Sequence, residues 1–181
     1  RTLCENNLKQ IALASLMYAD DNQGKLPAFL RWLKTRGNDI TSGKLYPYLK
    51  TKAIYMCPTD KKNLYSKSDP MARNLNPRSP RREYSYAMNC NICHANALSG
   101  FREPDKPVVY LEADLAPTDY SGQMGQLPGG KAISLRHGRK GHIVMGDLSV
   151  RSLNRKQFDD ASKHKYFWYP GDNRNMTMVP F

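Results

Sequence analysis

The sequence predicts an α+β fold in which a long N-terminal helix packs on a small antiparallel β-sheet, with a long irregular loop region between them. Three observations favour this fold. Apolar residues recur at helical spacing near the N-terminus, short β-branched and aromatic runs occupy the second half, and the stretch between them lacks periodicity. The chain has 181 residues, which suits one core, so we expect residues 1–181 to form a single domain.

The N-terminal helix is predicted over residues 2–21. Its main face recurs at three- and four-residue steps and consists of Leu8, Ile11, Ala12, Ser15, and Tyr18 or Ala19. We expect this face to pack on the sheet. Gly24 favours a helix exit because it accepts a positive φ, and Pro27 prevents continuation of the helix. No strong capping residue opens the helix, so we expect it to begin upstream of Arg1.

The loop region at 44–82 carries most of the chain's positive charge. It holds 10 basic and 2 acidic residues and contributes +8 to the net charge of +12. Its many turn-forming residues predict a largely irregular segment. Such a stretch either binds an acidic polymer or is a solvated surface loop, and we favour the solvated loop. The candidate polyanion-binding residues are Arg73, Arg78, Arg81 and Arg82. Nucleic acid is not an expected partner.

The second half offers five extended runs: 84–87, 107–113, 131–136, 142–145 and 149–153. The last three are joined by turn-forming residues at 137–141 and 146–148, so we expect them to form an antiparallel meander. The aromatic residues at 166–169 are expected to cap the sheet.

The four cysteines admit three interpretations; they are Cys4, Cys57, Cys90 and Cys93. Residues 90–94 read Cys-Asn-Ile-Cys-His, which matches the c-type haem attachment pattern, but no haem-pocket helix follows. Zinc held by Cys57, Cys90, Cys93 and His94 has suitable ligand types, but a second closely spaced ligand pair is missing. We therefore expect disulfides and no cofactor of either kind.

His137 and Asp147 invite comparison with an acid–base pair. The strand between them has about five residues and spans roughly 16 Å, so the two side chains belong to opposite ends of a hairpin. We expect His137 to close one turn and Asp147 to cap the other through its side chain. No Ser-His-Asp order or phosphate-binding loop stands out, so we predict no catalytic residue and do not expect an enzyme.

Five short motifs occur in order along residues 4–153. They are Cys4-Glu5-Asn6-Asn7-Leu8-Lys9-Gln10-Ile11, Tyr18-Ala19-Asp20-Asp21-Asn22, Tyr55-Met56-Cys57-Pro58-Thr59-Asp60, Tyr84-Ser85-Tyr86-Ala87-Met88-Asn89, and Arg136-His137-Gly138 with Asp147. This ordered set resembles the bacterial type II secretion pseudopilin-like proteins, which carry a prepilin-type leader and a C-terminal His-x9-Asp-Gly element. The family's Asp-Gly turn is Asp147-Leu148 here, so we expect a shifted or longer turn.

The resemblance implies a pilin-like fold and a non-enzymatic subunit of a type II secretion or type IV pilus-like assembly. Its partners would be other pseudopilin subunits, contacted through the N-terminal helix. An apolar segment upstream of Arg1 would anchor the protein in the inner membrane, with the soluble domain in the periplasm or at the cell surface. The alternatives are a surface module that binds acidic polymer or DNA through 44–82, and a c-type haem or redox protein.

The resemblance also bears on disulfides and ions. It makes Cys4–Cys57 the favoured long-range bridge, with Cys90 and Cys93 pairing locally or staying free. Pairing of Cys57 with Cys90 or Cys93 remains open. Similar major pseudopilins hold calcium near the end of the sheet, and oxygen ligands are offered here by Asp114, Asp119 and Asp172. These aspartates lack an EF-hand-like spacing, and we favour solvated loop residues over a calcium site.

Overall fold

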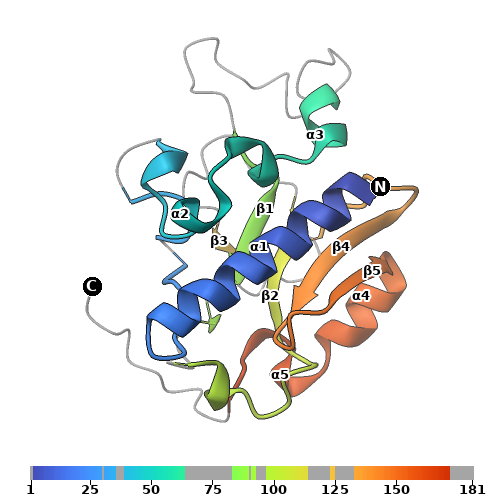
Figure 1. Cartoon of the computed structure of the whole chain (residues 1–181). Coiled ribbons are helices and arrows are strands. Elements are labelled where there is room, and N and C mark those ends of the chain that lie inside the picture. Colours follow the sequence, from blue (N-terminus) through green and yellow to red (C-terminus); the bar gives the residue numbers. More distant parts are fainter. Residues whose placement is uncertain are drawn as a thin grey trace.

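The protein is described by a computed structural model that covers residues 2–29, 31–35, 39–63, 83–89, 91–92, 97–113, 123–124 and 133–171 (Figure 1). The α-helices are α1 (Thr2–Asp21), α2 (Tyr46–Leu49), α3 (Pro58–Asn63), α4 (Arg155–Ser162) and α5 (Lys165–Trp168). The 3-10 helices are η1 (Ile40–Ser42), η2 (Lys52–Tyr55) and η5 (Leu98–Gly100). The strands are β1 (Tyr86–Asn89), β2 (Val108–Glu112), β3 (Gln123–Met124), β4 (Lys140–Met145) and β5 (Val150–Asn154).

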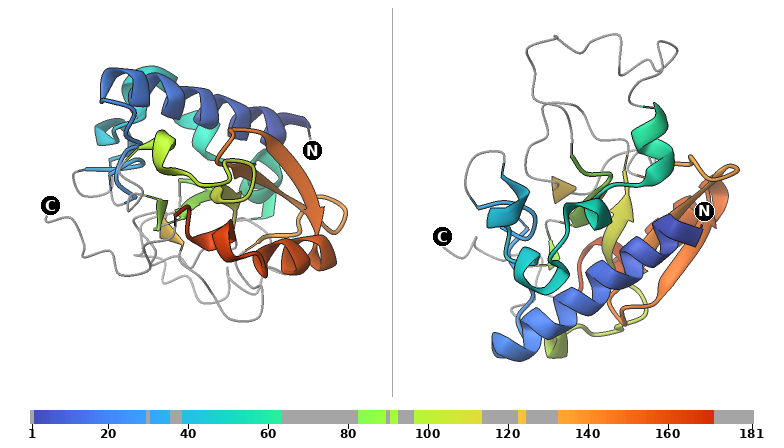
Figure 2. Two further views of the ribbon diagram at one scale, coloured as in Figure 1. Left: turned by 90° about the horizontal axis from the view of Figure 1, so that it is seen from below. Right: turned by 45° about the horizontal axis from the view of Figure 1, so that its top comes forward.

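The described elements form three layers. Helix α1 lies across one face of the sheet, and α4 and α5 lie against the other face (Figure 2). The sheet has the order β3-β1-β2-β4-β5, in which four strands pair antiparallel and the two-residue β3 pairs parallel with β1. The predicted α+β class is therefore confirmed, while its description as pilin-like remains a prediction.

Helix α1 matches the predicted bounds and buries the predicted face, including Leu8, Ile11 and Ser15. At its end the Gly24 N–H donates to the Ala19 carbonyl at 2.8 Å, and Gly24 has the expected positive φ of 76°. The helix therefore ends at a backbone conformation with positive φ, which glycine adopts without the strain that it causes in other residues. The described helices are all too short or too polar to serve as membrane spans.

The meander contains different strands from those predicted. It runs β1-β2-β4-β5, so β2 takes the place expected for a strand at 131–136. Residues 133–135 are not a strand; the Ser134 N–H instead donates to the Glu112 carbonyl at 2.8 Å, just beyond the end of β2. The chain there passes so close to Gly141 that a Cβ on this glycine would lie 2.1 Å from the Ser134 carbonyl oxygen. The prediction failed because local alternation carries no information about which strand is the neighbour.

Alternation along β1 and β2 decides which side chains face α1. Tyr110 on β2 lies 2.9 Å from the Ser15 hydroxyl of α1, and the Tyr86 hydroxyl on β1 accepts from the Asn7 amide at 3.3 Å. Glu112 follows Tyr110 by two residues and pairs with Tyr86 in the strand register. The Glu112 carboxylate is therefore placed on the α1 face, near the start of the helix.

The turn before β4 is closed by His137, as predicted. His137 and Lys140 exchange two backbone hydrogen bonds of 3.1 and 3.2 Å, and Gly138 and Arg139 between them both have positive φ. Two successive positive φ values define the two-residue type I′ turn, which matches the twist of the flanking chain. The turn holds the His137 backbone directly beside the first residues of β4.

The turn after β4 is capped by Asp147, also as predicted. The Asp147 carboxylate accepts from the Ser149 N–H at 2.9 Å and from the Ser149 hydroxyl at 2.6 Å. The turn is three residues long, and Leu148 adopts a φ of 62° where the resembled family has glycine. The expected longer turn is thus present. Gly146 is required by packing, since a Cβ there would lie 2.5 Å from the Phe101 ring.

The connecting region is more ordered than predicted where the structure describes it. Residues 44–63 contain α2, η2 and α3 in place of an irregular loop. Thr51 caps η2 by accepting from the Ala53 N–H, and Lys50 takes a left-handed φ of 56° after α2. The sequence indicates a short helical turn at 45–49, which α2 matches, whereas η2 and α3 are too short for periodicity to reveal them. Residues 64–82 lie outside the described residues, and so do Arg73, Arg78, Arg81 and Arg82.

The layer beneath the sheet is aromatic. Phe158 of α4 meets Phe167 and Trp168 of α5 in edge-to-face contacts, and all three are buried. The aromatic tail therefore caps the sheet as expected. The sequence interpretation missed α4, although its start carries a complete capping box in which Asn154 and Gln157 bond each other's backbone N–H.

Candidate functional site

Four buried side chains converge near the start of α1 and form what we call the buried donor cluster: Cys4, Cys57, Glu112 and His137. One sulfur, nitrogen or carboxylate oxygen from each residue lies within 4.8 Å of the others. Their exposed fractions are 1%, 0%, 0% and 9%, respectively. Thiols, imidazole and carboxylate are groups that bind metals or exchange protons, so the cluster is the candidate site.

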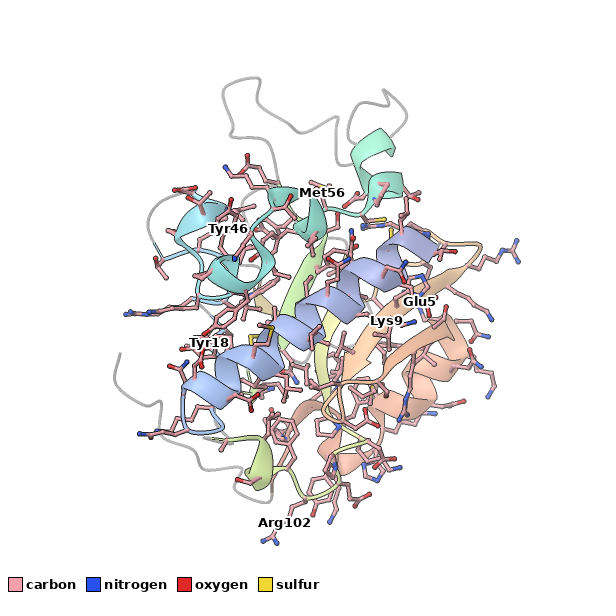
Figure 3. The ribbon with its side chains drawn as sticks, viewed as in Figure 1. Glu5, Lys9, Tyr18, Tyr46, Met56 and Arg102 are labelled. Carbon is pink, nitrogen blue, oxygen red and sulfur yellow. The ribbon has the colours of Figure 1, made fainter. Side chains whose placement is uncertain are left out.

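Each member of the cluster comes from a different part of the fold. Cys4 lies in the first turn of α1, Cys57 lies between η2 and α3, Glu112 ends β2, and His137 stands in the turn before β4. The segment that carries Cys57 is held against α1 because the Asn7 amide donates to the carbonyl of the preceding Met56 at 3.1 Å. Figure 3 shows Met56 above the first half of α1, where Glu5 and Lys9 also lie.

A buried acid–base pair stands at the centre of the cluster. His137 Nε2 lies 2.9 Å from Glu112 Oε1, and the other carboxylate oxygen accepts from the His142 N–H at 2.9 Å. The hydrogen bond to Glu112 raises the pKa of His137, against the opposing effect of burial. The His142 ring lies beside the His137 ring, with centroids 5.0 Å apart, which helps to fix the imidazole orientation.

The two thiols are in different electrostatic environments. A hydrogen bond from the Cys4 thiol lowers the pKa of Cys57, and the backbone N–H groups of Asp60 and Thr59 act in the same direction. The pKa of Cys4 is raised because its thiol donates to Cys57 and is buried. Cys57 is therefore the first of the pair to ionise, with His137 Nε2 at 3.4 Å from its sulfur.

A second set of buried polar groups surrounds Cys57. The Ser85 hydroxyl accepts from the Cys57 N–H at 2.9 Å and donates to Asp60 Oδ2 at 2.6 Å. Arg136 pairs with the same Asp60 oxygen at 2.8 Å and also donates to the Ala113 carbonyl at 3.1 Å. The side chains of Asp60 and Arg136 are each 7% exposed, so this ion pair is weakly screened by water. These contacts hold the Cys57 segment to the end of the sheet.

The geometry of the cluster argues against a catalytic cysteine and for a metal ion or a disulfide. A Cys-His-acid relay needs the sulfur and the carboxylate on different imidazole nitrogens, but both approach His137 Nε2 here. The thiols are also too buried to meet a substrate. Two thiols beside an imidazole and a carboxylate can instead share a metal ion, or the sulfurs alone can form a disulfide.

The structure brings together some of the predicted site residues. Cys4 and Cys57 are neighbours and stand as free thiols, so their disulfide stays a prediction. His137 belongs to the cluster, whereas Asp147 caps the turn at the other end of β4. The remaining predicted ligands lie outside the described residues: Cys90, Cys93, His94, Asp114, Asp119 and Asp172.

Glu112 is the site residue that the sequence interpretation missed. It was counted only as part of a strand at 107–113, yet it ends a run of four apolar residues on a strand that is buried throughout. A carboxylate at the end of a fully buried strand is a signal for a paired or metal-bound group, because an unpaired buried charge is strongly unfavourable.

The chain was also compared with known proteins. No protein-family model, curated protein or solved structure matches it. Its function is therefore argued from its own residues.

Proposed function

We propose that this protein is a non-enzymatic, pseudopilin-like subunit of a type II secretion or type IV pilus-like assembly. The observation that carries the proposal is that α1 has large apolar side chains on two opposite faces. One face is buried on the sheet, while Leu3, Leu13, Leu16 and Met17 are 63%, 58%, 37% and 46% exposed. The outer face also carries the polar residues Asn6, Lys9 and Gln10, so its exposed apolar side chains are the part that a partner would cover.

Three of the four exposed side chains form one patch, and Leu3 lies apart from it near the start of α1. Leu13, Leu16 and Met17 are spaced by three and four residues, which places them on a common side of α1. That side is turned away from the sheet, because the residues of α1 that are buried lie on its other side. Figure 1 shows the helix in front of the sheet. Contiguous exposed apolar residues of this kind mark interaction sites. The occupant we propose is the corresponding helix of a neighbouring pseudopilin subunit.

The order of sequence motifs supports the same class of protein. Under this proposal an apolar segment upstream of Arg1 extends the helix and anchors it in the inner membrane. The domain described here then faces the periplasm or the cell surface. The His137 and Asp147 turns, which correspond to the family's C-terminal element, serve the fold of the subunit rather than catalysis.

Two experiments test the proposal. The first reads the coding sequence directly upstream of Arg1. We expect a prepilin-type leader with a Gly-Phe-Thr-Leu-Ile-Glu-like start to the mature chain, and a domain of another type in that place would contradict the proposal.

The second experiment uses the full-length protein in its own host, with the photo-cross-linker p-benzoylphenylalanine at Leu13 or at Leu16. We expect cross-linked species that contain further pilin-like subunits. The matched control carries the cross-linker at Lys163, an exposed position after α4 on the far side of the sheet. Identical monomer-only patterns at Leu13, Leu16 and Lys163 would contradict the assembly.

A second candidate function, binding of an acidic polymer, is favoured by the net charge of +8 at 44–82. Retention of the chain on heparin should then fall steeply with salt, and replacing Arg78, Arg81 and Arg82 together by serine should abolish the excess retention. Equal retention of this variant and the wild type would exclude the candidate.

A further inference from the structure

We propose that the buried donor cluster is a structural zinc site in which Cys4 Sγ, Cys57 Sγ, His137 Nε2 and one Glu112 carboxylate oxygen bind a single Zn²⁺ ion. The inference is independent of the assembly proposed above. It rests on the convergence of four donor atoms, their burial and the contacts that orient them.

The positions of the donors suit a tetrahedral ion. With Zn–S near 2.3 Å and Zn–N or Zn–O near 2.0–2.1 Å, the edges of the ligand tetrahedron are about 3.3 to 3.8 Å. The Cys57 sulfur lies 3.4 Å from His137 Nε2, within this range, and no pair of donors exceeds 4.8 Å. The 2.9 Å contact between His137 and Glu112 needs to lengthen by a few tenths of an ångström. Donor pairs near the 4.8 Å limit need to close by about 1 Å, so binding requires side-chain adjustments of a few tenths of an ångström to about one ångström.

The charge of the cluster also favours a cation. Glu112 has no solvent exposure, and two thiols lie beside it in the same buried site. With both thiols deprotonated the cluster would carry three negative charges, of which Zn²⁺ would neutralise two. The protons of both thiols, and any proton on His137 Nε2, would pass to the solvent on binding. His137 would bind as the neutral imidazole through Nε2. A divalent ion thus accounts for a buried collection of ionisable groups that apolar packing alone does not explain.

Neighbouring contacts orient the ligands as they do in metal sites. The free oxygen of Glu112 accepts from the His142 N–H at 2.9 Å, and the Cys57 backbone N–H donates to the Ser85 hydroxyl at 2.9 Å. A second partner for a ligating carboxylate, and a hydrogen bond that fixes the backbone of a ligating residue, are outer-shell interactions of the kind found in metal sites. Hydrogen bonds from neighbouring groups therefore hold the ligand residues in place.

A disulfide between Cys4 and Cys57 is the competing account. It uses two of the four groups, and Glu112 and His137 would then serve only as the buried pair that they form with each other. The disulfide and the zinc site cannot be present together, because a disulfide sulfur is not a thiolate ligand. The same experiments therefore separate the two accounts.

The ligand types select the metal. Two thiolates favour a soft or borderline ion, and the added imidazole and carboxylate suit Zn²⁺ rather than Ca²⁺ or Mg²⁺. All four coordination positions are taken by protein groups, which is characteristic of structural rather than catalytic zinc. The ion would join α1, the Cys57 segment, the end of β2 and the turn before β4, so its binding would be coupled to the stability of the whole fold.

The first test measures zinc stoichiometry on the reduced 181-residue chain. The protein is stripped with a chelator, incubated with Zn²⁺ and desalted before metal analysis. We expect one retained zinc per chain in the wild type and in the Cys90→Ser/Cys93→Ser double variant, which removes the other two cysteines. Loss of zinc in that double variant, or no retained zinc in the wild type, would overturn the proposal.

The second test uses Co²⁺ as a spectroscopic substitute, and its reading on the wild type and the double variant does not depend on the folding of ligand variants. The wild type and the double variant should give the intense ligand-field bands of tetrahedral cobalt together with thiolate charge-transfer absorption. Cys4→Ser should reduce the charge-transfer intensity to about half, because one of two thiolates is lost. A weak octahedral spectrum in the wild type, or full intensity in Cys4→Ser, would contradict the assignment.

Ligand variants with a matched control complete the test. Glu112→Gln and His137→Gln should each weaken zinc binding by at least about tenfold, in line with losses seen on perturbing metal sites. His164→Gln makes the same change at a histidine outside the cluster, and we expect unchanged zinc affinity. Equal affinities in all three variants would overturn the proposal. So would peptide mapping that finds a Cys4–Cys57 disulfide together with no zinc uptake by the reduced chain.

Discussion

The two faces of the sheet bury side chains of different chemistry. Under α4 and α5, Phe158, Phe167 and Trp168 pack edge to face with centroids 5.1 to 6.2 Å apart. On the α1 side, the buried donor cluster collects polar groups from four segments that are distant along the chain. The residues of the aromatic layer are close in sequence, and their packing depends on the shape of the side chains. The donor cluster depends on every one of its polar partners being present.

The two regions should therefore lose stability in different ways when a side chain is substituted. In the aromatic layer the loss from a substitution follows the volume removed, and conservative apolar replacements are tolerated. On the α1 face, removing one polar partner leaves the others buried without their hydrogen bonds or charge compensation.

The largest effect is expected from Phe158→Ala. Phe158 is fully buried between Phe167 and Trp168, so its truncation should lower the free energy of unfolding by about 3–5 kcal/mol. Phe158→Leu should lose clearly less, because most of the volume is kept. Urea denaturation measures both values, and added zinc should shift wild type and both variants equally. A loss as large in Phe158→Leu as in Phe158→Ala would break the shape-based account of this layer.

The next effect concerns zinc itself. Free Zn²⁺ at 100 times its dissociation constant should raise the free energy of unfolding of the reduced wild type by about 2.7 kcal/mol. Cys4→Ser should show a much smaller response. Thermal melts with and without the ion test this difference, and the Cys90→Ser/Cys93→Ser variant serves as the control that keeps the response. A zinc response that survives in Cys4→Ser would place the ion elsewhere.

A smaller effect is expected where α1 meets β2. Ser15 donates to the Ile11 carbonyl and lies 2.9 Å from the Tyr110 hydroxyl. Ser15→Ala should lower the free energy of unfolding by about 1–3 kcal/mol, because the buried Tyr110 hydroxyl loses its acceptor. Adding Tyr110→Phe should restore part of that loss, since neither partner is then left unsatisfied. A fully additive double variant, measured by the same denaturation, would mean that the two hydroxyls do not interact.

The smallest effect is expected on the surface. Asp160 pairs with Lys156 and Lys163 at 2.7 and 2.9 Å, and these contacts lower the pKa of Asp160 to about 2. The pairs are solvent-exposed, so screening leaves them little influence on stability. Asp160→Asn should therefore keep the wild-type melting temperature and the full zinc response. A marked fall in melting temperature would show that surface charge matters more than this comparison allows.

The sequence alone was sufficient for the elements that depend on local signals. The face of α1, the exit at Gly24 and the turns at His137 and Asp147 follow from periodicity and turn chemistry. The strand expected at 131–136 is absent from 133–136, the part of it that the structure describes, because its alternation is local whereas strand pairing is decided by long-range contacts. The helix α4 was missed despite its capping box at Asn154.

The candidate site could be predicted only in part. Cys4 and Cys57 were brought together by the resemblance, and His137 was noticed for its motif, but nothing local joins these residues to Glu112. Their convergence depends on the register that sets Tyr86 opposite Glu112 and on α1 lying over that end of the sheet. Such placement is a property of tertiary structure, and no spacing along the chain encodes it.

The central claim, that the donor cluster binds zinc, is tested most directly by X-ray absorption at the zinc edge. The sample is the reduced Cys90→Ser/Cys93→Ser variant loaded with one equivalent of Zn²⁺, so that Cys4 and Cys57 are its only cysteines. We predict two sulfur ligands at about 2.3 Å and two nitrogen or oxygen ligands at about 2.0–2.1 Å. A first shell of nitrogen and oxygen alone, without sulfur, would contradict the account.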